Sequence, residues 1–386
     1  MLAITVYGLD KPGIVYGISN VLANANVNII DIEQKVSHGI FLMYVVADDS
    51  KSNLSFDELR NLLIEEGKKL GVSVHVSKFE ERESSKKNLY VITVLGKDRV
   101  GIVRDIAKIL LEHGVNIENT SLIARGKLIS IEFVVDVRNA NIEDLKRKLR
   151  KDIEKLNLDI VIQHYDEFKR EKRLIVFDMD STLVDAEIID ELAKYAGVEE
   201  EVRRITENAM KGDIDFKKAL EERVKLLKGL PVDVLERIYK NIRFTEGAKE
   251  LIQALKRAGY KVAVVSGGFT YFTDRLKEEL NLDYAFGNEL EIKDGKLTGR
   301  IKGRIIDANE KARIIEEIAM KEGISKENVV AVGDGANDKI MIENAGLGIA
   351  FNAKEALKDV ADGSISKENL IGLACVLGLF RKTEKF

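Results

Sequence analysis

Residues 174–183 of this 386-residue chain read LIVFDMDSTL. The four apolar residues at the start, β-branched and aromatic among them, predict a buried strand. Asp178 and Asp180 follow at once. Because ligands of an open parallel α/β sheet bind beyond the carboxyl ends of its strands, we expect a functional site here. Such an acidic pair can bind a hard cation or supply a nucleophile and a proton donor; the alternative is a plain Asp/Ser turn.

Two more apolar segments in the second half of the chain end in polar or glycine residues. Residues 262–265 (VAVV) lead into SGG, and residues 329–332 (VVAV) lead into GDGAND. Such β-branched runs suit strands that are buried on both faces, and the helical patterns between them suit right-handed crossovers. We therefore predict an α/β fold with a doubly wound parallel sheet, whose strand ends converge on one crevice. The crevice would contain Asp178, Asp180, Ser266, Asp334, Asn337 and Asp338.

The charges in this crevice predict its ligands. Three or more carboxylates repel one another, so a cation is required, and Mg2+ prefers oxygen ligands of this kind. A substrate phosphate would need hydrogen-bond donors as well. The Ser266 hydroxyl and the Gly267 backbone N–H can supply them, and Lys311, expected to open the helix before the third strand, adds a point charge.

Residues 187–241 form an insertion after the first strand, and their pattern predicts four helices. We expect these helices to form a small cap that covers the crevice and excludes water during the reaction. Residues 288–300, with an Asp-Gly turn, predict a hairpin nearby.

The first half of the chain repeats itself with an offset of 88 residues. GLDKPGIV from residue 8 resembles GKDRVGIV from residue 96, and VNI at 27–29 recurs at 115–117. This predicts a tandem duplication. Each copy predicts the order βαββαβ, the ferredoxin-like arrangement. We expect two domains, 1–80 and 88–166, joined by a charged, serine-containing linker.

The two copies resemble ACT domains, small modules that sense amino acids beside metabolic enzymes. The resemblance rests on the Asp-x-x-Gly-Ile-Val turn and on the Asn-Ile after the helix. A glycine turn leaves N–H groups at a helix start, which suits a small carboxylate such as that of L-serine. The alternative role is dimerisation through edge-to-edge pairing of the sheets. The candidate regulatory residues are Asp10, Gly13, Asn28, Asp98, Gly101 and Asn116.

Roughly residues 172–380 resemble the haloacid dehalogenase superfamily, and within it the phosphoserine phosphatases, so we expect a catalytic domain at 172–386. The matching motifs are DMDST at 178–182, SGG at 266–268, Lys311, and GDGAND at 333–338. The resemblance implies that Asp178 is the nucleophile, which forms an aspartyl-phosphate, and that Asp180 is the general acid and base. It also implies that Asp178, Asp334 and the main-chain carbonyl of Asp180 hold Mg2+, with Asp338 as a possible supporting residue.

The same resemblance implies the substrate contacts. Glu187 would pair with the ammonium group of O-phosphoserine, and Arg223 would bind its carboxylate in a bidentate manner. Met210 and Phe216 would be apolar contacts from the cap. The remaining substrate-binding residues would be Ser266, Gly267, Lys311 and Asn337.

The expected activity is therefore Mg2+-dependent hydrolysis of O-phosphoserine in serine synthesis. Two alternatives stay open. One is a phosphatase of another small phosphomonoester, such as phosphothreonine. The other is an amino-acid-responsive binding protein whose second half is catalytically idle.

Composition argues against several other classes. The net charge of −4 gives no general attraction to nucleic acid or to an anionic membrane, and the basic run at 146–151 reads as a solvated helix face. No signal-peptide pattern or apolar run of membrane-spanning length occurs. The single cysteine, Cys375, excludes an internal disulfide and a Cys-based zinc site. We expect a cytoplasmic protein that forms a homodimer.

Overall fold

The computed structural model describes residues 1–80, 87–138, 140–211 and 213–379, without the side chains of residues 210, 211 and 367–369. The chain forms two compact units, Met1–Lys86 and Lys87–Phe386, each with its own sheet. The second predicted boundary, near residue 170, falls within the second unit. The division into three domains therefore stays a prediction.

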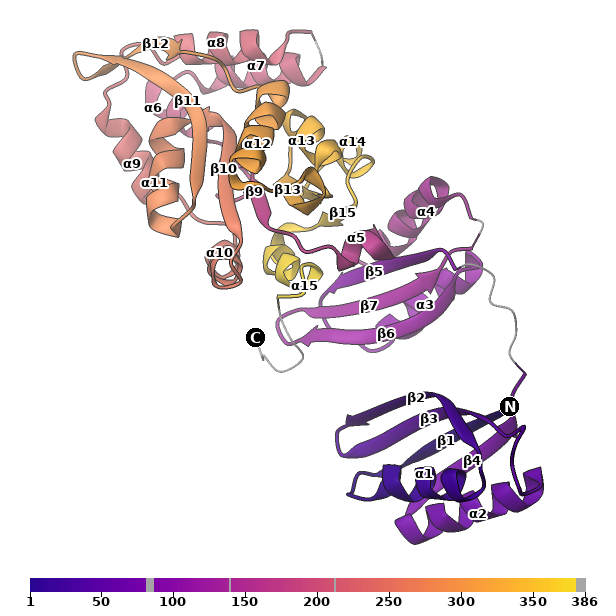
Figure 1. The fold of residues 1–386 in the computed structure, drawn as a ribbon. Helices are drawn as coiled ribbons and strands as arrows, with labels where there is room; N and C mark the ends of the chain where they lie inside the picture. Colours follow the sequence, from indigo (N-terminus) through magenta and orange to yellow (C-terminus); the bar gives the residue numbers. More distant parts are fainter. Residues whose placement is uncertain (81–86, 139, 212, 380–386) are drawn as a thin grey trace. The chain divides into compact units, whose positions relative to one another are not determined.

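The first unit is a four-stranded antiparallel sheet in the order β2-β3-β1-β4. Alternation along β1 buries Leu2, Ile4 and Val6 under two helices. The second helix begins with a capping box between Ser55 and Glu58. The predicted βαββαβ order is confirmed, with β1 (Leu2–Leu9), α1 (Ile14–Asn24), β2 (Asn28–Ser37), β3 (Ile40–Asp48), α2 (Phe56–Leu70) and β4 (Val72–Lys78) (Figure 1).

The second repeat has the same order but a different neighbour. Its last strand, β8, pairs with β15 (Gly363–Ile365) through Val161 opposite Gly363 and Ile160 opposite Ser364. One eleven-stranded sheet therefore runs from this repeat into the rest of the unit, in the order β12-β11-β10-β9-β13-β14-β15-β8-β5-β7-β6. The repeat consists of β5 (Leu89–Gly96), α3 (Ile102–Glu112), β6 (Asn116–Arg125), β7 (Ile129–Asp136), α4 (Ile142–Glu154) and β8 (Asp159–His164), followed by α5 (Tyr165–Lys169).

The remainder of the second unit is the predicted doubly wound α/β fold. Strand β9 (Leu174–Phe177) lies between β10 (Lys261–Phe269) and β13 (Val329–Gly333), and both pairings are parallel. Phe177 is opposite Val264 and Val332, so β9 and β13 end at nearly the same level, while β10 continues to Phe269. Strands β11 (Tyr284–Lys293) and β14 (Leu347–Phe351) extend the parallel sheet on either side.

Helices cover both faces of this sheet because side chains of β9 alternate between two apolar clusters. Leu174 and Val176 pack with residues of α12 and α13, whereas Ile175 and Phe177 pack with residues of α10, α11 and α15. Lys311, expected to open its helix, lies within the first turn, because α12 begins at Ala308 after the capping residue Asp307. The helices are α10 (Ala248–Arg257), α11 (Thr270–Leu280), α12 (Ala308–Glu322), α13 (Lys339–Asn344), α14 (Glu355–Lys358) and α15 (Leu373–Val376).

The predicted cap helices are present as α6 (Ile188–Ala196), α7 (Glu199–Lys211), α8 (Phe216–Leu226) and α9 (Asp233–Asn241). The predicted hairpin is formed by β11 and β12 (Lys296–Lys302). It joins the cap through backbone hydrogen bonds between Leu297 and the Gly229–Leu230 segment after α8. In Figure 1 this hairpin lies beside α8.

Across the described ranges of the chain, no helix has the length and apolar content needed to span a membrane.

Candidate active site

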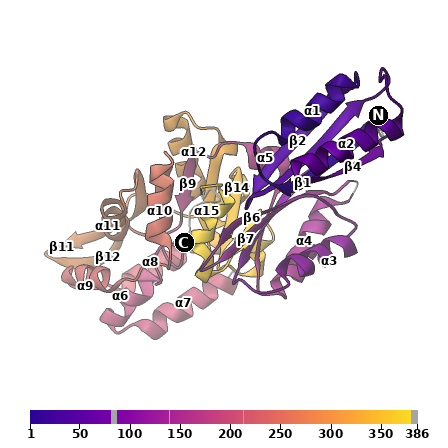
Figure 2. The same ribbon diagram turned by 90° about the horizontal axis from the view of Figure 1, so that it is seen from below.

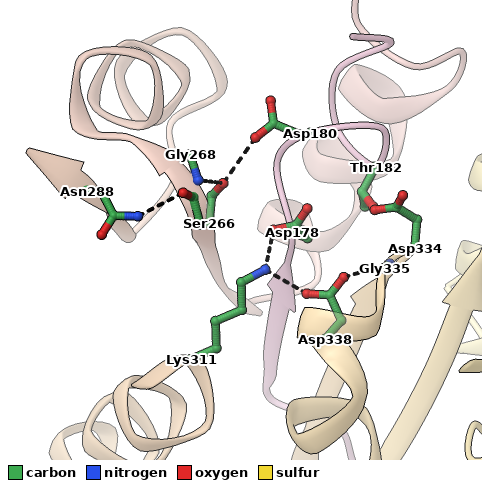
Figure 3. Close-up of polar contacts among 11 residues, drawn as sticks. Asp178, Asp180, Thr182, Ser266, Gly268, Asn288, Lys311, Asp334, Gly335 and Asp338 are labelled. Carbon is green, nitrogen blue, oxygen red and sulfur yellow. Dashed lines mark hydrogen bonds and ion pairs between the residues drawn. The ribbon is translucent and has the colours of Figure 1, made fainter. Parts of the chain in front are cut away.

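The crevice beyond β9 is built around a buried lysine between two carboxylates. Lys311, Asp178 and Asp338 are 0%, 4% and 0% exposed. Lys311 Nζ donates to Asp178 Oδ1 and to Asp338 Oδ1, the latter at 2.6 Å (Figure 3). Burial alone would lower the pKa of Lys311, but the charges of the two aspartates outweigh it and raise that pKa. Lys311 is therefore a permanent cation beside the end of β9.

Asp334, after β13, completes a group of carboxylates. Oxygen atoms of Asp178, Asp334 and Asp338 all lie within 4.8 Å of one another. The Thr182 hydroxyl donates to Asp334 at 3.3 Å, and the Gly335 N–H donates to Asp338 at 3.0 Å. Three carboxylates at this spacing suit a hard cation with oxygen ligands. The side chain of Asp180 is not in this group, and the role of its main-chain carbonyl at a metal stays a prediction.

Burial and mutual repulsion raise the pKa values of the carboxyl groups in the crevice. Burial, helped by the charge of Asp338, raises the pKa of Asp178 to about 7 even though Lys311 opposes the shift. Burial, with the charges of Asp178 and Asp338, raises the pKa of Asp334 to about 8. Burial, followed by the charges of Glu187 and Asp178, raises the pKa of Asp180 well above its ordinary value. The crevice thus carries more negative charge than Lys311 alone offsets, so a further cation would stabilise it.

The end of β10 places the Ser266 hydroxyl beside Asp180. The Ser266 hydroxyl is 3.4 Å from Asp180 Oδ2 and accepts a hydrogen bond from the Gly268 N–H at 2.8 Å. Asp180 Oδ1 accepts from the Ile188 N–H at 3.0 Å, which links it to the start of the cap. A side chain on Gly267 would collide with the Phe216 ring, so glycine allows the cap to come this close.

The cap contributes Glu187, Phe216 and Arg223 to the same pocket. These three residues line it together with Asp178, Asp180, Ser266, Gly267, Asp334 and Asn337. The predicted set is therefore brought together, with one exception: the side chain of Met210 lies outside the described residues. Arg223 hydrogen-bonds only within the cap in the described structure, through Nε to Ala219 O and Nη1 to Thr206 Oγ1. Burial raises the pKa of Glu187, with a further contribution from Asp190.

Sequence reasoning missed three residues that hold the predicted ones. Asn288 is buried, donates to Gly267 O at 2.7 Å and accepts from the Ile306 N–H at 2.8 Å, which ties the β10 loop to the approach of α12. Ser181 donates to Glu187 Oε1 at 2.7 Å from a left-handed backbone conformation with φ 56°. Thr182 binds Asp334. Ser181 and Thr182 belong to the motif DMDST, so the motif could have identified them. No pattern in the sequence around Asn288 indicates its role.

The candidate regulatory residues lie on the two repeats, outside this pocket. Gly13 and Gly101 both have left-handed φ angles, 100° and 95°, at the starts of α1 and α3. The two turns differ in their charges. Asp98 is paired with Arg125 at 2.8 Å, whereas Asp10 forms no side-chain hydrogen bond or ion pair with any residue that the structure describes. Asn28 and Asn116 begin β2 and β6.

Comparison with known proteins adds independent information. Residues 175–343 match the model of haloacid dehalogenase-like hydrolases, and residues 1–77 and 88–163 match that of ACT domains. The chain is 68% identical to a phosphoserine phosphatase of Archaeoglobus fulgidus over 89% of this chain and 99% of the relative. It is 37% identical to one of Streptomyces coelicolor over 99% and 93%. A crystal structure of a probable phosphoserine phosphatase from Vibrio cholerae matches with a TM-score of 0.60 and 33% identity, over 75% of this chain and 86% of that one.

Proposed function

The chain belongs to the phosphoserine phosphatase family of haloacid dehalogenase-like hydrolases, and we propose that it hydrolyses O-phospho-L-serine to L-serine and phosphate through an aspartyl-phosphate on Asp178. One observation carries the proposal. Asp178 and Ser266 line one pocket with Glu187 and Arg223 of the cap, and the buried Lys311 is paired with Asp178. Groups for a phosphate and for a zwitterion therefore lie around a single pocket.

In the first step, a carboxylate oxygen of Asp178 attacks phosphorus, and the bond from phosphorus to the serine oxygen breaks. Asp178 Oδ1 accepts from Lys311, which leaves Oδ2 for the attack. Lys311 and the donors at Ser266 and Gly267 offset charge on the equatorial phosphoryl oxygens, which is most of what phosphoryl transfer requires.

Asp180 gives its proton to the departing serine oxygen. Its raised pKa favours the protonated carboxyl before transfer. The resulting carboxylate then takes a proton from water, whose oxygen attacks the aspartyl-phosphate. Phosphate leaves, and Asp178 returns to its starting state.

The predicted Mg2+ fits the carboxylates present. Asp178 and Asp334 would hold it, together with the main-chain carbonyl of Asp180, and the proximity of Asp338 supports including that residue near the ion. When bound, the ion would neutralise charge on the carboxylates and on the phosphoryl group.

The cap residues suit an amino-acid substrate. Glu187 can pair with the ammonium group, and the free N–H groups of Arg223 can bind the carboxylate in a bidentate manner. Phosphothreonine differs from phosphoserine by one methyl group, and a pocket discriminates such a difference by only about 10–200-fold. A comparison of kcat/KM for the two substrates therefore decides between this proposal and its nearest alternative.

The central test is phosphate release from O-phosphoserine with Mg2+. We expect Asp178→Asn to lose essentially all turnover, and the exposed cap variant Asp233→Asn, matched in chemistry, to retain it. Chelation of Mg2+ should abolish activity, and its return should restore it. An active Asp178→Asn protein, shown by mass spectrometry not to have deamidated, would refute the covalent mechanism.

For the N-terminal region we propose serine binding at the first turn. The open Asp10 and the helix start at Gly13 support it, whereas Arg99 and Arg104 fill the second turn by pairing with Asp105. Serine should inhibit the full chain and lose this effect on a chain that starts at Lys87. Equal inhibition of both proteins would remove the regulatory role.

We also propose that the first unit supports a homodimer. Its edge strand β2 is available for pairing, and Tyr7, Leu9 and Leu42 are 53%, 72% and 50% exposed. Sedimentation should show a dimer that is weakened by Leu42→Asp and not by Leu62→Asp, which places the same charge at an exposed residue of α2.

A further inference from the structure

Thr206, on cap helix α7, holds Arg223 without lining the pocket. Its hydroxyl donates to Val202 O one turn earlier at 3.0 Å. The same oxygen accepts from Arg223 Nη1 at 3.3 Å. Because the hydroxyl proton is directed to the carbonyl, a lone pair is left for the guanidinium group.

The second anchor of Arg223 lies on its own helix. Its Nε donates to Ala219 O at 3.2 Å, so neutral acceptors on α8 and α7 bind two different N–H groups of one planar fork. Nη2 finds no partner among the residues that the structure describes, nor does any carboxylate there form an ion pair with Arg223. The guanidinium is thus oriented while it still has donors for an anion in the pocket.

We propose that Thr206 is a positioning residue that sets the plane of the Arg223 guanidinium, and that it thereby gives the enzyme its preference for phosphomonoesters that carry an α-carboxylate. The proposal rests on the proposed role of Arg223 in binding that carboxylate. A guanidinium that is free to rotate would still attract the carboxylate, but it would lose the two parallel hydrogen bonds that need a fixed plane.

The test compares two substrates that differ in the carboxylate: O-phospho-L-serine and O-phosphoethanolamine. Thr206→Val keeps the shape of the side chain and removes the hydroxyl. We expect it to raise KM for phosphoserine by roughly three- to tenfold, with kcat changed by less than about twofold. For phosphoethanolamine, kcat/KM should stay unchanged. Thr206→Ser, which keeps the hydroxyl, should restore the KM for phosphoserine.

A purely structural role predicts a different pattern. If the Thr206 hydroxyl only holds α8 against α7, Thr206→Val would lower kcat/KM for both substrates together and lower the thermal midpoint. Either that result or an unchanged KM for phosphoserine would overturn the proposal. Thr206→Ala offers a second variant without the hydroxyl in case valine disturbs the cap.

Arg223→Lys separates this proposal from the one on which it rests. Lysine keeps the charge and loses the fork, so Thr206→Val should have no further effect in this background. If Arg223→Lys leaves the KM for phosphoserine unchanged, the carboxylate role of Arg223 fails. If Arg223→Lys raises that KM and Thr206→Val alone does not, only the role of Thr206 fails.

Discussion

The two βαββαβ modules, β1–β4 and β5–β8, share one fold and differ in what covers their sheets. On the outer face of the first, Tyr7 and Leu42 are directly opposite each other and 53% and 50% exposed. Their counterparts in the second, Leu95 and Ser130, are also opposite each other and are fully buried. Leu95 belongs to the apolar cluster that contains Leu373 and Val376 of α15. Figure 2 shows α15 near strands β6 and β7 of this module.

A second difference lies in the helix before the last strand. Arg150 on α4 donates to the carbonyl oxygens of Lys358, at 2.6 Å, and of Ala361, next to β15. The corresponding residue of α2 is Ile64, counted from the capping residues Ser55 and Asn141. One copy of a duplicated module has thus become part of the structural support of the catalytic sheet, while the other has apolar residues exposed on the corresponding face of its own unit.

Removing first one module and then both from the N-terminus should give the largest difference. A chain that starts at Lys87 should keep its phosphatase activity and thermal midpoint. A chain that starts at Glu171 should lose at least ~3 kcal/mol of stability, because β15 loses its partner strand and the apolar cluster loses Leu95, Leu128 and Val161. Calorimetry of both proteins measures this, and equal midpoints would contradict the comparison.

A pair of glycine variants should sharpen the comparison. A Cβ on Gly363 would lie 2.8 Å from Val161 Cα across the β8–β15 pairing, so Gly363→Ala should destabilise the second unit by about 2–3 kcal/mol. A Cβ on Gly8 would likewise collide with Val72, within the first module. We expect only Gly363→Ala to lower the temperature at which activity is lost.

Arg150→Ala should have a smaller effect. It removes two hydrogen bonds from a cation to carbonyl groups, which corresponds to roughly 1–3 kcal/mol. Urea unfolding, followed through the loss of activity, should show a lower midpoint for Arg150→Ala. Ile64→Ala should leave the midpoint of this transition unchanged. If Arg150→Ala and the wild type have the same midpoint, Arg150 does not stabilise the second unit through these hydrogen bonds.

The smallest effect concerns the single cysteine. Cys375 on α15 is buried, and burial raises the pKa of its thiol to about 12. Alkylation at pH 8 should therefore be slow and should speed up about tenfold per pH unit, because the thiolate fraction rises with pH below that pKa. Gly363→Ala should accelerate it and Gly8→Ala should not, with activity unchanged at low temperature. Equal alkylation rates in both variants would show that the accessibility of Cys375 on α15 does not depend on how the second module packs.

Local sequence patterns were enough for most of the catalytic half. Apolar runs ending in DMD, SGG and GDGAND predicted β9, β10 and β13 and the crevice at their ends, because parallel strands place their carboxyl ends together. The 88-residue repeat predicted both modules. The interpretation of 146–151 as a solvated face was wrong for Arg150, which is partly buried: helical periodicity shows which residues share a face but not what will cover it.

Only the tertiary structure shows the contacts between segments that are far apart in the sequence. The pairing of β15 with β8 joins a three-residue strand to one about 200 positions earlier, and a strand so short has no pattern of its own. Asn288 and Thr206 carry no local signal either, because their roles depend on Gly267 and Arg223, which folding brings to them. The sequence by itself was enough to predict the candidate reacting groups, because they follow directly after strands. The residues that orient them became visible only where packing placed a donor against an acceptor.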